Sequence, residues 1–364
     1  MGTRRTSGRS VGRNLLRWYR RTRKPLPWRD DPAPYRVWVG EVMSQQTTLG
    51  VVVPRFERFV QELPDVRALA GCREARLGRL WAGLGYYARA RNLRKGAQLV
   101  VRERSGLLPE TYEGWLAIPG CGPYTAAMIA SVCFGAREAA VDGNVVRVAS
   151  RLLSLEEGVW DGGGRRRIER FAGELMERTS SPGDLNQAVM ELGQEICAKK
   201  GPTCGACPVR TSCLALARGV VDRCPPPRPR RRPVDRAVTV VVVRHPASGR
   251  VLVGTRREGF LASTVGFALI DTKAEKKMLE RIASLAAVEP ERPGRPFKHT
   301  ITHHRIAARV LVLDIGGRAP ARARLAEALG LDSADWVPWA HARSAVASAL
   351  DGKALGQIRA RRPG

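Results

Sequence analysis

The sequence lacks any long apolar run, and this absence excludes a membrane-spanning protein. Its longest apolar run covers residues 237–243, whereas a bilayer span needs about 20 consecutive apolar residues. The basic N-terminal stretch also lacks the apolar core that a secretory signal peptide carries. We therefore expect a cytoplasmic protein that has no membrane partner.

Acidic side chains are scarce relative to basic ones. The 364 residues include 34 Asp and Glu against 62 Lys and Arg, which gives a net charge of +28. Most of the excess is arginine, whose planar guanidinium suits phosphate because it donates two hydrogen bonds at once. The charge therefore predicts a nucleic-acid partner. The alternative is a GC-rich genome that favours arginine codons.

Eight cysteines are present, and four of them fall in one short stretch with the spacing C-x6-C-x2-C-x5-C: Cys197, Cys204, Cys207 and Cys213. Disulfides are rare in the cytosol, so this stretch predicts a metal or cluster site. Structural zinc usually uses paired Cys-x2-Cys motifs, and only one such pair is present here. A [4Fe-4S] cluster also takes four thiolates, and the spacing favours it over zinc.

The chain divides by composition into three parts. Residues 11–217 predict a mainly helical domain that ends with the cysteine loop. Residues 218–236 are rich in proline and arginine and predict a stiff linker. Residues 237–360 predict a smaller α+β domain, with two strands joined by a turn at residues 247–249, a helix near 272–286 and a strand near 305–314.

Residues 116–131 read LAIPGCGPYTAAMIAS and predict a tight turn between two helices. Gly120 and Gly122 let a ligand approach the backbone closely. Pro123 suits the first turn of the second helix, where its missing N–H costs nothing. The free N–H groups at that helix start would bind a phosphate oxygen. The alternative is an ordinary turn between two helices.

This order of elements, a helix, the turn PGCGP and a second helix, resembles the helix-hairpin-helix of DNA repair glycosylases. In the endonuclease III superfamily, this hairpin precedes an essential aspartate and often an iron–sulfur loop; here Asp142 and then the cysteine stretch follow it. The motif GEVMSQQTT at 40–48 is similar to the signature of adenine DNA glycosylases, as are LPWR at 26–29 and GLGYYARARNL at 83–93. The resemblance covers residues 14–217 strongly and the remainder weakly.

This resemblance implies a role for particular residues. Glu41 would be the acid that protonates adenine, and Asp142 the anion that stabilises the positive charge developing on the sugar. Without the motif, Glu41 would be read as a solvated residue at the edge of a helix, and Asp142 as a helix N-cap. Further residues are implied as the substrate pocket: Trp28, Arg29, Tyr124 and Asn144. Others are implied as DNA contacts: Gln46, Tyr86, Gly120, Gly122 and Thr125.

Tyr124 stands where bifunctional relatives of this superfamily carry a lysine. A phenol cannot form the Schiff base that a lysine amine forms with a sugar. The resemblance therefore implies a monofunctional enzyme, which removes the base without an efficient strand-cleaving step. Its expected partner is double-stranded DNA with adenine opposite 8-oxoguanine or guanine, bound by a nucleoid-associated monomer.

The C-terminal part resembles, more faintly, the Nudix-like recognition domain of these glycosylases. It lacks the glutamate cluster of Nudix hydrolases, so we expect no phosphohydrolase activity. Thr302 and His303, in the stretch ITHHRI, stand where the family reads 8-oxoguanine. Two alternatives remain: a mismatch glycosylase for thymine or uracil opposite guanine, and a catalytically weak DNA-binding relative. The presence of both Glu41 and Asp142 argues against a catalytically weak relative.

Overall fold

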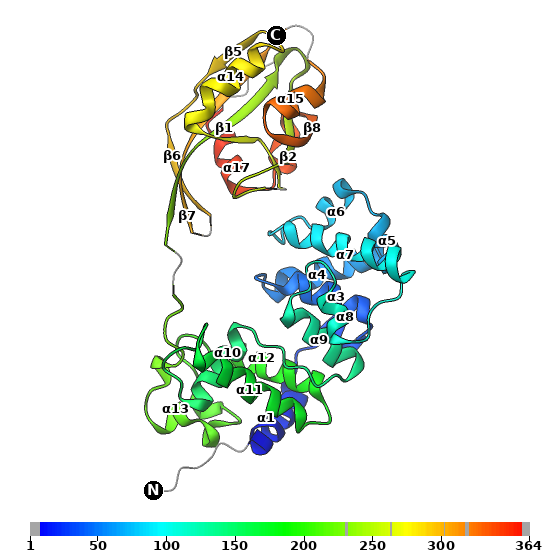
Figure 1. The fold of residues 1–364 in the computed structure, drawn as a ribbon, viewed down its shortest axis with the longest axis vertical. Helices are drawn as coiled ribbons and strands as arrows, with labels where there is room; N and C mark the ends of the chain where they lie inside the picture. Colours follow the sequence, from blue (N-terminus) through cyan, green and yellow to red (C-terminus); the bar gives the residue numbers. More distant parts are fainter. Residues whose placement is uncertain (1–7, 230–231, 263, 302, 317–319, 359–364) are drawn as a thin grey trace. The chain divides into compact units, whose positions relative to one another are not determined.

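The computed structural model describes residues 8–229, 232–262, 264–301, 303–316 and 320–358 (Figure 1). The chain divides into two compact units, a helical unit (Met1–Arg228) and a sheet unit (Pro229–Gly364). The predicted fold class, a mainly helical part followed by a smaller α+β part, is confirmed. None of the described helices is long and apolar enough to cross a membrane.

The helical unit contains two hydrophobic cores. The first is built by α2 (Pro27–Asp30), α3 (Pro34–Ser44), α4 (Leu49–Glu62), α5 (Val66–Gly71), α6 (Glu74–Leu80), α7 (Ala88–Arg104), α8 (Tyr112–Leu116) and α9 (Pro123–Phe134). The second is built by α1 (Gly8–Thr22), α10 (Gly143–Leu153), α11 (Gly163–Glu177) and α12 (Pro182–Glu195). Short elements follow: η1 (Cys204–Ala206), η2 (Arg210–Ser212), α13 (Leu214–Ala217) and η3 (Val221–Arg223).

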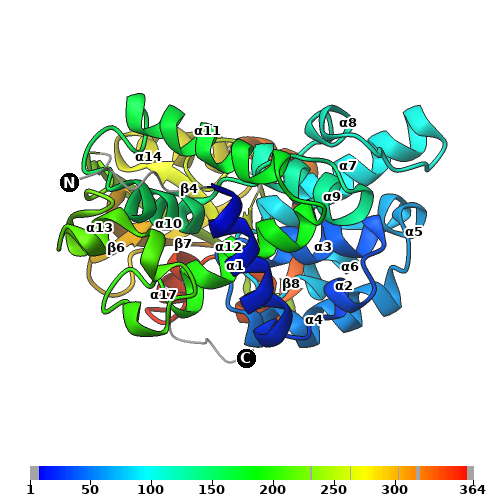
Figure 2. The same ribbon diagram turned by 90° about the horizontal axis from the view of Figure 1, so that it is seen from below.

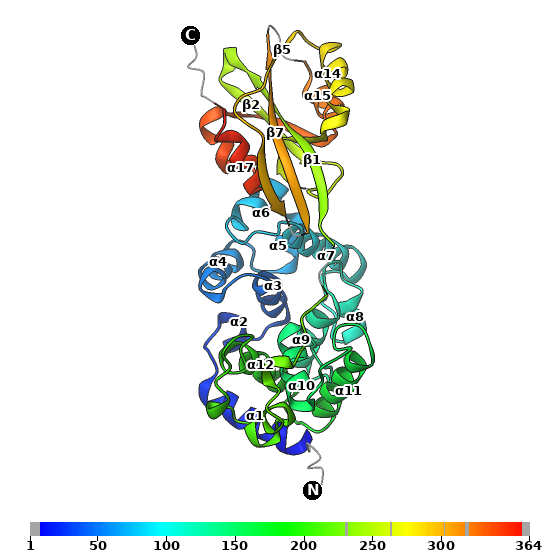
Figure 3. The ribbon, with the colours of Figure 1, turned by 90° about the vertical axis from the view of Figure 1, so that its left-hand side faces the viewer.

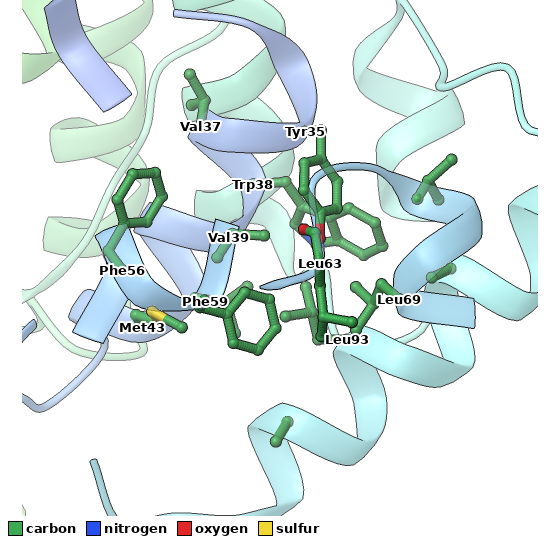
Figure 4. Packing of buried hydrophobic residues seen from close by; sticks show 14 of the residues in the cluster. Tyr35, Val37, Trp38, Val39, Met43, Phe56, Phe59, Leu63, Leu69 and Leu93 are labelled. Carbon is green, nitrogen blue, oxygen red and sulfur yellow. The ribbon is translucent and has the colours of Figure 1, made fainter. Parts of the chain in front are cut away.

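Aromatic side chains fill the first core (Figure 4). Trp38 on α3 is fully buried, and its ring meets the ring of Trp115 edge-on with centroids 5.5 Å apart. Phe59 on α4 packs in the same way against Trp81, at 6.0 Å. Truncating such a buried aromatic side chain to Ala costs about 3–5 kcal/mol. This packing fixes the orientation of α3, the helix that carries Glu41.

The second core joins the start of the chain to helices that come more than a hundred residues later. Figure 2 shows α1 lying against α12, and Leu15 of α1 is buried together with Leu185 of α12. Helix α10 packs on α12 with Val148 and Ala149. The helix that begins at Asp142 therefore belongs to a different core from the helix that carries Glu41, and the site lies between the two.

The sheet unit has a mixed eight-stranded sheet in the order β3-β2-β1-β7-β5, with β4 on β1, β6 on β7 and β8 on β2. The strands are β1 (Val234–His245), β2 (Arg250–Arg256), β3 (Val265–Gly266), β4 (Ala268–Asp271), β5 (Val288–Glu291), β6 (Phe297–Ile301), β7 (His304–Ile315) and β8 (Leu331–Pro338). The two longest, β1 and β7, are parallel. The strand pair around the turn at 247–249 and the strand near 305–314 were predicted.

Alternation along β1 places side chains on both faces of this sheet. Val240 and Val242 face one core, and Val241 and Val243 face the other. Helix α17 (Ala349–Leu355) covers the first face, while α14 (Glu275–Ala283) and α15 (Arg322–Ala328) cover the second (Figure 3). A strand buried on both faces must be apolar along its whole length, which explains the apolar run at 237–243.

Candidate active site

Glu41 is a buried acid in the middle of α3. The hydroxyl of Tyr124, from the first turn of α9, donates a 3.1 Å hydrogen bond to Oε2 of Glu41. Burial raises the pKa of Glu41 above its ordinary value; the Tyr124 hydrogen bond and the Arg29 cation oppose this effect, and the Asp142 charge adds to it. A carboxyl group in such surroundings suits a general acid.

Asp142 caps helix α10, and its carboxylate is surrounded by donors. Oδ1 accepts from the backbone N–H groups of Asn144 (2.8 Å) and Val145 (2.9 Å), and Oδ2 accepts from Nδ2 of Asn144 at 2.7 Å. Three N–H donors at a helix N-terminus suit a carboxylate anion. The cap that the sequence predicts for Asp142 is thus present, and it orients the carboxylate expected to act in catalysis.

Asn144 is held in turn by Arg147, one turn further along α10. Nη2 of Arg147 donates to Oδ1 of Asn144 at 2.9 Å and to the Gly193 carbonyl at 2.6 Å. Nε of Arg147 donates to the carbonyl of Cys197 at 2.8 Å. A chain of hydrogen bonds therefore runs from Asp142 to the first cysteine of the cysteine loop.

Sequence reasoning missed two residues on α12 that complete the site. Glu191 is buried and forms an ion pair with Arg29. Sδ of Met190 lies 2.7 Å from the hydroxyl oxygen of Tyr124. The sequence predicts this stretch only as part of the helical domain that precedes the cysteine loop. No local pattern marks Glu191, because its neighbours one turn away on α12, Gln187 and Glu195, are polar as well.

Of the expected pocket residues Trp28 and Arg29, one packs in the core and the other forms an ion pair at the site. Trp28 is 2% exposed and packs in the first core against Phe56, with ring centroids 4.8 Å apart. It also lies flat on Gly40, where an added Cβ would come within 2.5 Å of the indole. Trp28 therefore supports α3 from inside the core and is not brought together with the polar groups of the site. Arg29 does reach the site, but its charge is engaged by Glu191.

The hairpin connects α8 to α9 as the sequence predicts. Gly120 has a positive φ of 86°, and a Cβ there would lie 2.7 Å from the Cβ of Asn92, so only glycine fits. Gly122 is the exposed N-cap of α9, and Pro123 follows at its first position. The side chain of Thr125 is buried and accepts a hydrogen bond from Gln45 at 3.2 Å. The side chain of Thr125 therefore contacts the protein itself, and the expected DNA contact at this residue stays a prediction.

The two expected wedge residues share an unusual backbone conformation. Gln46 has a φ of 58° and Tyr86 a φ of 46°, and both side chains are exposed. Non-glycine residues at positive φ are uncommon, and such strained conformations cluster at functional sites. Each residue stands at the tip of a loop, one after α3 and one before α7.

Arg89, in the motif GLGYYARARNL, joins these two loops through hydrogen bonds to their backbone. Its guanidinium donates to carbonyl groups in the last turn of α3, at 2.8 Å to Val42 and 3.0 Å to Met43, and to the carbonyl of Gln45 in the loop that follows. It also donates to carbonyl groups of the second loop, at 3.0 Å to Leu84 and 3.2 Å to Gly85. The guanidinium of Arg89 therefore bonds to carbonyl groups of the protein itself.

The cysteine loop follows α12 directly. Its four cysteines are free thiols, and Cys197, Cys207 and Cys213 pack against the second core. Among the described residues, no group of three or more His, Cys, Asp or Glu side chains is arranged to hold a single metal ion. A zinc ion needs all its sulfurs about 2.3 Å from one centre, whereas each thiolate of a [4Fe-4S] cluster binds a different iron. Four thiols in one loop are a donor set that fits a [4Fe-4S] cluster, and four thiols can also bind zinc.

In the sheet unit, Thr302 lies outside the described residues. His303 precedes β7, and its carbonyl accepts a hydrogen bond from the N–H of Val234 at 2.9 Å. Its ring contacts that of His304, with centroids 4.2 Å apart, and His304 contacts Phe260 at 5.3 Å. His303 and His304 lie at the hairpin between β6 and β7, and Phe260 lies in the segment between β2 and β3.

The chain is similar to known DNA repair proteins. A family model described as HhH-GPD superfamily base excision DNA repair protein matches residues 39–173. A solved thermostable thymine-DNA glycosylase superposes with a TM-score of 0.53 at 25% identity, covering 58% of this chain and 97% of that one. An endonuclease III trapped on DNA superposes at 0.50 with 21% identity, covering 60% and 99%, and this likeness shows the fold alone.

The helical unit and the matching model thus define a DNA glycosylase of the helix-hairpin-helix superfamily, an enzyme that hydrolyses N-glycosidic bonds. Sequence similarity shows which family of DNA glycosylases this chain resembles. The adenine DNA glycosylase of Rattus norvegicus is 31% identical, with 92% of this chain and 75% of the relative covered. The chain belongs to the adenine DNA glycosylase family. The enzyme of Mus musculus is 39% identical over 56% of this chain, which spans 41% of that longer relative.

Proposed function

We propose that this enzyme removes adenine from DNA where it is mispaired with 8-oxoguanine or guanine. The presence of two carboxyl groups in different surroundings, Glu41 and Asp142, carries the proposal. One carboxyl group is buried with a raised pKa, and the other accepts three N–H bonds at a helix N-terminus. This pair matches the chemistry required, since adenine leaves poorly unless it is protonated while the sugar becomes positively charged.

In this proposal, Glu41 donates its proton to adenine as the glycosidic bond breaks. Asp142 faces the developing positive charge on the sugar and stabilises it, as one carboxylate does in glycoside hydrolysis. Asn144 keeps Asp142 oriented, and Tyr124 keeps Glu41 oriented. The adenine must first leave the duplex, which costs a few kcal/mol. Gln46 and Tyr86, exposed at their loop tips, would fill the space that the base leaves.

The enzyme is proposed to be monofunctional because Tyr124, rather than an amine, stands at the hairpin. Reaction products should be abasic sites that break mainly after alkali, and borohydride trapping should be weak. Tyr124→Lys should add trapping by placing an amine near the sugar. Efficient trapping by the wild type would show that another amine attacks the sugar.

We further propose a [4Fe-4S] cluster on Cys197, Cys204, Cys207 and Cys213. When bound, it supplies no acid or base to the reaction, and it ties the cysteine loop to the second core next to α10. Purified protein should be brown and contain iron with little zinc. Stoichiometric zinc without iron in anaerobically prepared protein would overturn this assignment.

The test of the main proposal is one single-turnover assay on three duplexes: A opposite 8-oxoguanine, A opposite guanine, and T opposite guanine. We expect release of adenine and none of thymine. The third duplex tests the alternative that the thymine-DNA glycosylase likeness raises. Glu41→Gln should bind the duplex and lose about 10²–10⁴-fold in rate. Glu177→Gln, exposed at the end of α11, is the matched control. Near-normal turnover by Glu41→Gln would contradict its role as the acid.

A further inference from the structure

Arg151 is a buried cation on the last turn of α10, and it touches both ends of residues 197–224, an extended loop that contains the four cysteines. It is 3% exposed. At one end, Nη1 donates to the carbonyl of Ala198 at 2.9 Å and to the carbonyl and the Sγ atom of Cys197, each at 3.2 Å. At the other end, Nε donates to the carbonyl groups of Cys224 at 2.8 Å and Val221 at 3.2 Å.

The environment of Arg151 differs from that of the other deeply buried arginines. In the sheet unit, Arg244 pairs with Asp314 and Arg256 with Asp351, each at 2.6 Å. Across the described residues, Arg151 forms no ion pair with a carboxylate. A buried charge is costly unless a group of opposite charge compensates it. The acidic group in contact with Arg151 is the thiol of Cys197, which is a thiolate when it ligates iron.

We propose that Arg151 is a positioning residue for the [4Fe-4S] cluster, an inference that rests on the cofactor proposed above. Its guanidinium compensates the negative charge of the cluster thiolates and donates an N–H···S bond to Cys197. It also fastens residues 221–224 to residues 197–198, which closes the loop around the cluster. Hydrogen bonds to cluster sulfurs and nearby charge set both the reduction potential and the retention of the cluster.

The test compares Arg151→Met and Arg151→Lys with wild-type holoprotein. Arg151→Met keeps the length of the side chain and removes its charge and donors. We expect a lower reduction potential, because the reduced, more negative cluster loses a cation and an N–H···S bond. We also expect loss of iron to a chelator at least about ten-fold faster, as is typical when a partner of a metal ligand is removed. Arg210→Met, an exposed charge between Cys207 and Cys213, is the matched control.

The possible outcomes separate the proposals. Iron-loaded Arg151→Met with wild-type potential and iron-loss rate would overturn the role of Arg151 and leave the cluster intact. Wild-type protein without iron would overturn the cluster assignment and the inference together. If Arg151→Met yields no soluble protein, Arg151→Lys decides: one ammonium cannot bond both loop ends, so iron loss should be faster. If Arg151→Lys lost iron at the wild-type rate, the role of Arg151 in joining the two loop ends would be contradicted.

Discussion

The hydroxyl of Tyr124 lies 3.1 Å from Oε2 of Glu41 and 2.7 Å from Sδ of Met190. A phenol has one proton to donate, so the ionised carboxylate and the thioether compete for it. Through this hydroxyl, α9 and α12 both act on the acid of α3. The protonation of Glu41 is therefore controlled by residues that are far apart in the sequence.

Replacing Tyr124 with Phe should move the alkaline limb of the pH–rate profile upward. The Tyr124 hydrogen bond lowers the pKa of Glu41, so its removal should keep the acid protonated to higher pH. Single-turnover adenine release from pH 5 to 9 measures the limb. Met190→Leu keeps the hydroxyl bond to Glu41 and is the control, with no upward shift expected. If the alkaline limb of Tyr124→Phe lies at the same pH as that of the wild type, the hydroxyl does not control the pKa of Glu41.

Glu41→Gln should be more stable than the wild type at neutral pH. The unfolded chain ionises Glu41 near the ordinary pKa of about 4.3, whereas burial keeps the folded carboxyl protonated to higher pH. The free energy of unfolding of the wild type therefore falls as pH rises from that value through the folded pKa. Urea unfolding at pH 5 and pH 8 should show the advantage of Glu41→Gln growing with pH. Glu191→Gln should instead lower stability, because it leaves the buried Arg29 unpaired.

Two substitutions at Asp142 should separate its two roles. Asn is as good an N-cap as Asp, whereas Ala costs about 0.5–2 kcal/mol. Asp142→Asn should therefore keep wild-type stability and Asp142→Ala should lose it, as measured by thermal unfolding. Both should lose at least about 10²-fold in base release, because neither supplies the anion. An active Asp142→Asn would mean that the cap, and not the charge, is the functional contribution.

Arg89→Met should weaken both loops that carry the wedge residues. Several carbonyl groups would lose their donor, and each buried group left unpaired costs about 1–3 kcal/mol. We expect lower stability together with slower adenine release from duplex DNA. Arg91→Met, which removes a neighbouring half-buried arginine of α7, is the control. Release rates equal in the two variants would argue against a role for Arg89 in positioning the loops.

A chain truncated after Arg228 should retain adenine release and lose preference for 8-oxoguanine over guanine. Glu41, Asp142 and the four cysteines all lie in the helical unit. In the full chain, Thr302→Ala with His303→Ala should lose roughly ten-fold in preference, since a good base contact contributes about 1–3 kcal/mol. The preference is measured as the ratio of the single-turnover rates on the two mispairs. Unchanged preference in both variants would place recognition in the helical unit, around Gln46 and Tyr86.

Local features of this protein follow from the sequence because they depend on neighbouring residues. The hairpin follows from Gly120, Gly122 and Pro123, whose backbone properties demand a turn and then a helix start. The cap at Asp142 depends on N–H groups only two and three residues away. The apolar run at 237–243 contains too many consecutive β-branched residues for anything but a buried strand.

The remaining features depend on contacts between distant segments, which no local pattern contains. Whether an arginine meets DNA or its own backbone is decided by which carbonyl groups the fold brings near it, as Arg89 and Arg151 show. The LPWR motif gave no indication that Trp28 is buried against α3 or that Arg29 meets Glu191, more than 160 residues away. The sequence by itself determined the hairpin, the cap, three strands of the sheet (β1, β2 and β7) and the order of the functional groups. Only the tertiary structure decided which of the buried charges are paired, because pairing requires two chain segments to be packed at contact distance.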